Sequence, residues 1–458
     1  MRDVVSRYAV RRDPSDRFSE LADDLPGVVP EAPLAFPQRP GGLNPLLGEA
    51  NGELPQSDDA FQVRVQAPDD AAGAPVVVFV PGGGFMTGTG TARWFTSPDL
   101  VDRAGIVLVT VSYRIGALGH LGPTGDPLES QRGLRDLLHA LRWVAAHVAD
   151  LGGDPEDVTL AGDSAGAWYA YALATLPEAR GLFRRVALVS LPREAPLDAA
   201  GYAARRETLL SALGGDLVSA APDAVLDAQG ELARAFAGRG MALMPAAGGP
   251  VPADLHDFAA SAPWLHVDEL ALLSTSEEAA AFLRPAPDEA FGPATVDGFL
   301  RGRFADPAAV AAWIEAKRPG ATPKQRLAEA MTLHQFRLAH LELAAAAQAA
   351  GLRAFVAGFS VQSPLPGAFS PHCFPLPFLF GDREAWHDAP MLDGLGDDLF
   401  GAVSGALQEW LVGFARDGAP AAGGRSLPAF DAAAPLRLEL DGPTPRLAAP
   451  TELGLVAR

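Results

Sequence analysis

The chain contains five short apolar runs separated by segments with the pattern of helices and loops. The runs are residues 75–80 (PVVVFV), 106–111 (IVLVTV), 157–161 (DVTLA), 185–190 (RVALVS) and 270–276 (LALLSTS). Strands that are apolar at nearly every position are typical of a parallel sheet covered by helices on both faces. Buried strands that alternate with helices therefore predict an α/β fold with right-handed crossover connections.

The other segments extend this architecture. They comprise loops and short strands over residues 1–55, a strand at 61–67, a helix at 131–149, a last core strand at 352–359 and a C-terminal helix at 400–415. We predict a single domain over residues 1–458, with a central, mostly parallel sheet flanked by helices. Residues 195–265 and 285–350 interrupt the alternation, and we expect them to form helical insertions that act as a cap or regulatory region.

The charge of the chain limits its partners. Its 36 Lys and Arg residues against 56 Asp and Glu residues give a net charge of −20. Such a surface repels phosphate backbones and anionic lipids, so neither nucleic acid nor a membrane is expected as a partner. We expect a small uncharged substrate instead.

The location is predicted from what the sequence lacks. Cys373 is the only cysteine, residues 1–10 (MRDVVSRYAV) have no apolar signal core, and no uncharged apolar run reaches about 18 residues. These features favour the cytoplasm. No sequence feature demands an assembly, so a monomer or a homodimer is expected.

The most specific local motif is Gly-Asp-Ser-Ala-Gly at residues 162–166. It follows a predicted strand and precedes a predicted Ala-rich helix, which is the context that a G-x-S-x-G nucleophile turn requires. Small residues two positions either side of Ser164 let the backbone pass closely, so the turn can expose the serine hydroxyl. We therefore predict that Ser164 is a nucleophile and that the Ala165 amide points into its site.

A second motif, Pro81 followed by the glycines of residues 82–84, ends the strand at 75–80. A glycine run presents backbone N–H groups with no side chain in the way, as an oxyanion hole needs. A phosphate-binding loop is excluded because no Gly-Lys-Ser or Gly-Lys-Thr follows.

A nucleophilic serine of this kind needs an acid and a histidine that follow it in the chain. Beyond the predicted acid region the histidines are His334, His340, His372 and His387. The first two fall in a helical stretch, whereas His372 lies in a Pro-rich loop after residues 352–359, at the carboxyl edge of the sheet. Glu277 and Glu278 follow the strand at 270–276 at the same edge, and spacing alone does not separate them.

Motifs over most of the chain resemble the type-B carboxylesterase family, which includes bacterial para-nitrobenzyl esterases and the cholinesterases. The resemblance rests on residues 57–65 (SDDAFQVRV), 78–85 (VFVPGGGF), 112–121 (SYRIGALGHL), 141–167 (ending VTLAGDSAGA), 181–190 (GLFRRVALVS), 410–420 (WLVGFARDGAP) and 427–431 (LPAFD). The family implies an α/β-hydrolase fold and a serine hydrolase that cleaves carboxylic esters through an acyl-enzyme, with no metal and no organic cofactor.

The resemblance also assigns roles. It implies Ser164 as nucleophile, His372 as general base and Gly83, Gly84 and Ala165 as the oxyanion-hole amides. In the family's acid motif the glutamate lies four residues before a phenylalanine, and counting back from Phe282 selects Glu278 over Glu277.

Three residues beside these elements are candidates for the substrate pocket: Phe85, Met86 and Trp168. Core packing is an equally open interpretation for each of them.

Some positions depart from the family pattern. Pro81 replaces a histidine before the glycines, Pro375 replaces an acidic residue after His372, and Ala60 replaces a cysteine that secreted members use in a disulfide. The last change fits a cytoplasmic protein.

Three alternatives stay open. The same catalytic groups could hydrolyse an amide, a carbamate or a lactone, and a binding homologue could have lost activity. An epoxide hydrolase or dehalogenase of this fold would need an aspartate where the chain has Ser164.

Overall fold

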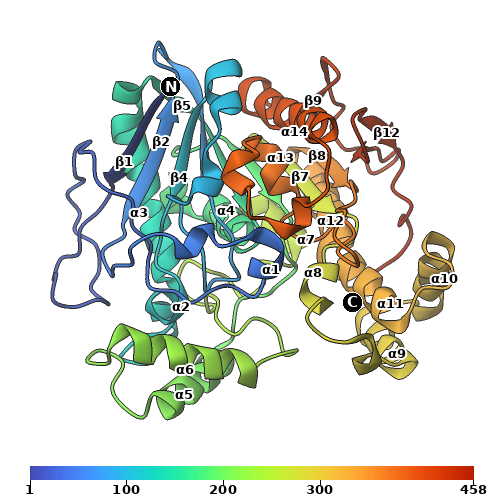
Figure 1. Cartoon of the computed structure of the whole chain (residues 1–458), viewed down its shortest axis with the longest axis horizontal. Coiled ribbons are helices and arrows are strands. Elements are labelled where there is room, and N and C mark those ends of the chain that lie inside the picture. The colour runs from blue at the N-terminus through green and yellow to red at the C-terminus, as the bar shows by residue number, and fades with distance from the viewer. Residues whose placement is uncertain (458) are drawn as a thin grey trace. The chain divides into compact units, whose positions relative to one another are not determined.

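Each apolar run of the sequence forms a strand in the computed structural model, which describes residues 1–457. The five strands are β3 (Ala74–Val80), β4 (Val107–Val111), β5 (Gly153–Asp163), β6 (Arg185–Val189) and β7 (Glu269–Thr275). Every residue of β4, β6 and β7 is buried, as expected for strands covered on both faces. Helices lie between these strands along the chain, so the predicted α/β fold is confirmed (Figure 1).

The chain folds into two compact units, and each contains segments that are distant in sequence. The first unit comprises residues 1–41, 49–186 and 194–267, and the second comprises residues 42–48, 187–193 and 268 onward. The chain passes from the first unit to the second within β6. The prediction of one domain over the whole chain stays a prediction.

In the first unit the strands lie in the order β1 (Arg2–Arg7), β2 (Gln62–Ala67), β4, β3, β5. The pairs β1–β2 and β2–β4 are antiparallel, while β4–β3 and β3–β5 are parallel. The register pairs Val80 at the end of β3 with Gly162 near the end of β5. The glycine run after β3 and the serine after β5 therefore leave the same edge of the sheet.

Two helices of the first unit follow directly from the sequence pattern. Residues 131–149 form α3 (Arg132–His147) and a short 3-10 turn, with Leu134, Leu137 and Leu141 buried. Helix α4 (Ala165–Thr175) starts immediately after Ser164 and is buried along its whole length. Its Ala-rich sequence suits this position, because small side chains let a helix approach the strands beside it.

Residues 195–265 are mixed helix and loop, as predicted. They contain α5 (Ala199–Leu213) and α6 (Pro222–Ala235), which pack against each other (Figure 1, green). Apolar side chains from both helices join Leu118 and Leu121 in a separate buried cluster. The role of this insertion as a cap stays a prediction.

In the second unit β7 pairs in parallel with β8 (Arg353–Phe359). The core strand predicted at residues 352–359 is confirmed as β8, but it is not the last one, because β11 (Arg437–Leu440) pairs in parallel with β8 and β12 (Arg446–Ala448) follows it. The four residues of β11, RLEL, have no continuous apolar run. Only their pairing with β8 identifies them as a core strand.

The second unit also contains the other helical insertion. It is formed by α9 (Pro293–Arg303), α10 (Pro307–Lys317), α11 (Pro323–Thr332), a π-helical turn at Leu333–Arg337 and α12 (Leu338–Ala349). The predicted C-terminal helix is α14 (Asp397–Asp417). Within residues 1–457, none of the helices has both the length and the apolar character needed to cross a bilayer.

The close packing of α4 on β3 gives a stability prediction. A β-carbon at Gly166 would lie 2.0 Å from the Val80 carbonyl oxygen, whereas one at Gly230 in α6 would meet no atom within 4 Å. Gly166→Ala should lower the free energy of unfolding by at least about 2 kcal/mol, because the helix must move away from the strand. Gly230→Ala is the matched control and should raise it by about 0.5–1 kcal/mol. Denaturant unfolding of both variants is the measurement, and equal effects would contradict the prediction.

Candidate active site

Ser164 occupies the one-residue turn between β5 and α4. Its φ of 55° and ψ of −120° lie in a region that residues with side chains rarely adopt. Such backbone strain amounts to about 1–3 kcal/mol and persists only where the surrounding structure imposes it. Ser164 is partly exposed although both of its neighbours are buried. The strained turn therefore presents the serine side chain at the surface of a buried junction.

The two glycines of the motif, Gly162 and Gly166, lie where there is no room for a side chain. A β-carbon at Gly162 would lie 2.5 Å from the carbonyl carbon of Gly166, and one at Gly166 would contact the end of β3. Real β-carbons do not approach backbone atoms so closely. Glycine at both positions lets the strand end and the first helical turn pass each other, and this contact keeps Ser164 in its positive-φ conformation.

The loop after β3 packs directly against this turn. A β-carbon at Gly82 would lie 2.6 Å from the carbonyl oxygen of Asp163 and 3.0 Å from Cβ of Ser164. Gly83 has a φ of 127°, and a β-carbon there would lie 2.1 Å from the Thr87 carbonyl oxygen. The glycine run is therefore needed both for contact with the serine turn and for its own conformation.

Hydrogen bonds set the direction of the amides in this loop. The Gly83 carbonyl accepts bonds from Met86 N, Thr87 N and Thr87 Oγ1, each at 3.1 Å. In a trans peptide the carbonyl and the following N–H point in opposite directions, so the Gly84 N–H points away from Thr87. The Ala165 N–H belongs to the first turn of α4, where helical amides lack partners within the helix. Gly84 and Ala165 are two of the three residues, with Gly83, whose amides the family resemblance assigns to an oxyanion hole, and that role stays a prediction.

The candidate pocket residues differ in their surroundings. Phe85 and Trp168 are 1% and 0% exposed, their rings pack edge to face at 5.7 Å, and Trp168 Nε1 donates to the Glu194 carbonyl at 2.8 Å. Both side chains thus pack in the interior of the first unit. Met86 is partly buried and contacts the apolar cluster beneath α5 and α6. Their role in binding substrate stays a prediction.

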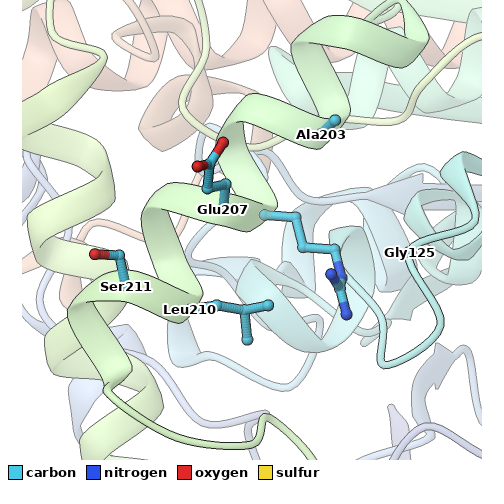
Figure 2. Close-up of a pocket in the computed structure, with 6 residues that line it drawn as sticks. Gly125, Ala203, Glu207, Leu210 and Ser211 are labelled. Atoms are coloured by element: carbon cyan, nitrogen blue, oxygen red, sulfur yellow. The ribbon is translucent and has the colours of Figure 1, made fainter.

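A surface pocket of about 580 Å³ lies elsewhere in the first unit, on α5 (Figure 2). Arg206 in its lining donates to the carbonyls of Gly122 and Pro123 at 2.9 and 2.7 Å, so its charge is directed to the backbone. The residues that line the pocket are Gly125, Ala203, Arg206, Glu207, Leu210 and Ser211. None of them was predicted as a site residue.

In the second unit the structure brings together His372 and Glu278. The two side chains are 1% and 0% exposed, and Nδ1 of the imidazole lies 2.6 Å from Oε2 of the carboxylate. Glu278 follows the end of β7, and His372 lies in the loop after β8. Because β7 and β8 pair in parallel up to Thr275 and Phe359, both side chains come from the same edge, as predicted.

Glu278 has further partners that hold its charge in place. Its Oε1 accepts hydrogen bonds from Thr275 N and Ser190 Oγ, both at 2.7 Å. Burial alone would raise the pKa of Glu278, but His372 beside it and these donors together hold the pKa below its ordinary value. When the ionised Glu278 accepts a hydrogen bond from Nδ1–H, the other ring nitrogen, Nε2, is left without a proton. In this arrangement a histidine can act as a base.

Glu277 points to a different set of groups. Its carboxylate contacts Arg318 at 3.0 Å and Lys317 at 3.5 Å, and it accepts a hydrogen bond from Ser370 N at 3.2 Å. Burial alone would raise the pKa of Glu277, but Lys317 and the hydrogen bonds and cations around it keep the pKa lowered. The alternative that spacing left open is therefore decided by geometry, which brings Glu278 and not Glu277 to His372.

Sequence reasoning missed Ser190 as a partner of Glu278. It follows the apolar run of β6 and has a positive φ of 52°. Its position directly after a core strand, like that of Ser164, is a signal that could have identified it. Two aromatic rings beside His372 were also not predicted as its neighbours: Phe282 at 4.9 Å and Phe336 at 5.4 Å between ring centroids.

The other three candidate histidines lie on other elements. His334 lies in the π-helical turn and His340 in α12, both buried, in agreement with a structural role. Burial lowers the pKa of His340 to about 4, so its imidazole is neutral near pH 7. His387 is exposed, and its Nδ1 lies 2.9 Å from the Glu384 carbonyl.

The chain is similar to several known proteins. Residues 36–201 match the model of the carboxylesterase family. A phenmedipham hydrolase of Pseudarthrobacter oxydans is 32% identical over 416 residues, which cover 87% of this chain and 80% of that protein. A probable N-octanoylanthranilate hydrolase of Rhodococcus erythropolis is 30% identical over 85% of this chain and 84% of its own. A solved structure of a PNB esterase is 25% identical and superimposes with a TM-score of 0.77 over 97% of this chain and 92% of its own. The chain therefore belongs to the carboxylesterase family.

Proposed function

We propose that the protein is a serine hydrolase that cleaves carboxylic esters, with Ser164 as its nucleophile. The observation that carries the proposal is the backbone of Ser164, held at a φ of 55° between β5 and α4. Strain of this kind is concentrated at functional sites, because the surrounding structure must offset it. The membership of the chain in the carboxylesterase family supports the same reaction class.

The proposed reaction has two steps. His372 accepts the proton of Ser164 as its Oγ attacks the ester carbonyl, and Glu278 orients the imidazole and stabilises its charged form. The amides of Gly83, Gly84 and Ala165 stabilise the negative charge of the tetrahedral intermediate. The alcohol then leaves with the proton held by His372. A water molecule gives its proton to His372 and attacks the acyl-enzyme, and the bond to Ser164 Oγ then breaks as His372 returns the proton to that oxygen, which releases the acid.

A second candidate function is hydrolysis of a carbamate or an amide by the same groups. It is favoured by the two relatives that match most of this chain, one named for the carbamate phenmedipham and one for an N-acylated anthranilate. The same nucleophile, base and amides can transfer the acyl group of an ester, a carbamate or an amide to serine. The proposed catalytic groups, which include Ser164 and His372, therefore do not distinguish these substrates. The leaving group would have to be distinguished by the substrate pocket.

Removal of the nucleophile and of the acid gives the primary test. Ser164→Ala should lower kcat for para-nitrophenyl acetate by about 10⁴-fold or more, and Glu278→Gln by about 10³- to 10⁴-fold, because the imidazole loses its orienting charge. Glu277→Gln is the matched control, since it removes the neighbouring carboxylate, and it should retain far more activity. Circular dichroism would establish that all three variants fold.

Labelling with a fluorophosphonate probe separates an enzyme from an inactive binding homologue. We expect stoichiometric labelling of the wild type and none of Ser164→Ala. A folded wild-type protein that neither reacts with the probe nor cleaves any ester would contradict the proposal and favour the binding homologue.

A panel of substrates tests the choice between the two functions. Para-nitrophenyl acetate, butyrate and octanoate should be compared with a para-nitrophenyl carbamate and with para-nitroacetanilide. We expect the highest kcat/KM for a para-nitrophenyl ester, because amide and carbamate carbonyls are stabilised by the adjacent nitrogen. A higher kcat/KM for the carbamate or the anilide would favour the second candidate.

The hydrogen bond from Ser190 to Glu278 gives a further prediction. Ser190→Ala should lower kcat by about 10-fold, because a hydrogen bond to a charged group contributes about 1.5–3 kcal/mol and Glu278 must stabilise the imidazolium as it forms. Ser404→Ala removes a buried hydroxyl from α14 and is the control, with an expected change below about 2-fold. Steady-state kinetics of both variants are the measurement, and equal losses would refute a role for Ser190 in positioning the acid.

A further inference from the structure

The glycine run after β3 has no side chains of its own with which to fix its shape. Residues 82–84 carry no side chains, and a glycine backbone rotates more freely than that of any other residue. Catalytic donors, in contrast, must be held within about 10–20° of the productive geometry. The orientation of the Gly83 and Gly84 amides must therefore be set by groups outside the glycine run.

One short segment after β4 holds the loop at two points. Tyr113 Oη donates a hydrogen bond to the Pro81 carbonyl at 2.7 Å, and Gly116 N donates to the Phe85 carbonyl at 2.7 Å. Pro81 and Phe85 are the residues that flank the three glycines. Residues 113–116 thus hold both ends of the glycine run.

This segment is itself firmly anchored in the first unit. Ser112 N donates to the Gln62 carbonyl at 2.9 Å, and the Ser112 carbonyl accepts from Tyr8 Oη at 2.9 Å. The fully buried guanidinium of Arg114 pairs with Asp136 at 2.6–3.2 Å. The Tyr113 ring packs edge to face on Tyr169 at 5.2 Å. The hydroxyl of Tyr113 is therefore held in place on a rigid support.

We infer that Tyr113 is a positioning residue for oxyanion stabilisation, acting through the Pro81 carbonyl. The inference rests on the proposed function. The bond fixes the plane of the Pro81–Gly82 peptide, and the next peptide carries the Gly83 N–H. If that plane moves, the peptide that carries the Gly83 N–H is displaced with it, because the two peptide planes share the Cα atom of Gly82. A displacement of about 1 Å can lower a rate by about 100-fold.

The hydroxyl of Tyr113 suits this role because it stays protonated. Burial, together with the nearby Asp163 carboxylate, raises the pKa of Tyr113 above its ordinary value. The side chain is therefore a neutral donor throughout the range in which an esterase is assayed. Its carbonyl acceptor does not titrate, so the contact is independent of pH.

The experiment compares Tyr113→Phe with Tyr171→Phe. Both variants remove a buried tyrosine hydroxyl that makes a hydrogen bond within the first unit, but Tyr171 Oη bonds to Ser261 Oγ at 2.6 Å and touches neither the glycine loop nor the segment that holds it. Two readouts are needed: kcat and KM for para-nitrophenyl acetate, and the inhibition constant of an alkyl trifluoromethyl ketone. This inhibitor adds to the nucleophilic serine and forms an oxyanion, so its affinity reports on the amides.

For Tyr113→Phe we expect kcat to fall by about 10-fold and the inhibition constant to rise by about 10-fold, with KM changed by less than about 2-fold. Tyr171→Phe should change all three by less than about 2-fold, even if it lowers stability as much. If the wild type is active but the two variants have equal effects, the inference about Tyr113 is overturned and the proposed function is not. A wild type that neither cleaves the ester nor binds the ketone would overturn the proposed function with it.

A second pair of variants tests the inference even if Tyr113→Phe does not fold. Incorporation of 4-aminophenylalanine at position 113 keeps a donor, whereas 4-fluorophenylalanine fills similar space without one. The amino variant should retain most of the wild-type kcat and inhibitor affinity, and the fluoro variant should lose both by about 10-fold. Equal kinetics for the two would overturn the role of the hydrogen bond.

Discussion

The ends of β3 and β5 and the first turn of α4 approach one another so closely that two positions have no room for a β-carbon. Gly162 and Gly166 fill these positions, and the residue between them, Ser164, takes a positive φ as a consequence. The same contact brings Gly82 against Cβ of Ser164. The strained serine and the position of the glycine loop beside it therefore follow from one packing constraint, which the parallel register of β3 and β5 imposes.

The second unit solves a different physical problem, which is to keep a carboxylate charged in a buried place. Glu278 does so with three donors, His372, Thr275 N and Ser190 Oγ. Its neighbour Glu277 is also buried but uses Lys317 and Arg318 at the end of α10, within the helical insertion. Glu277 accepts in addition from Ser370 N, two residues before His372. The insertion is thus connected by charge to the loop that carries the histidine, and its residues contribute to holding that loop.

Two departures from the family pattern are accommodated locally. Pro375 begins the short helix α13 (Pro375–Phe380), where the missing N–H of a proline has no consequence and its fixed φ suits the helix. Pro81 has no N–H to hold the glycine loop, but its carbonyl is held by Tyr113. Both prolines therefore occupy positions at which the backbone contacts do not need the donor that proline lacks.

The sequence alone determined the features that depend on local pattern. Continuous apolar runs predicted the strands, strand–turn–helix context and glycine spacing predicted the Ser164 turn, and position after a core strand predicted the edge from which Glu278 and His372 come. Tertiary structure decided which of two adjacent glutamates meets His372, because side-chain direction in a turn depends on packing. It also supplied Ser190, which lies 88 residues from Glu278, the hold of Tyr113 on Pro81, and the pairing of β11 with β8. These contacts join residues with no shared local pattern, so only the folded chain brings them together.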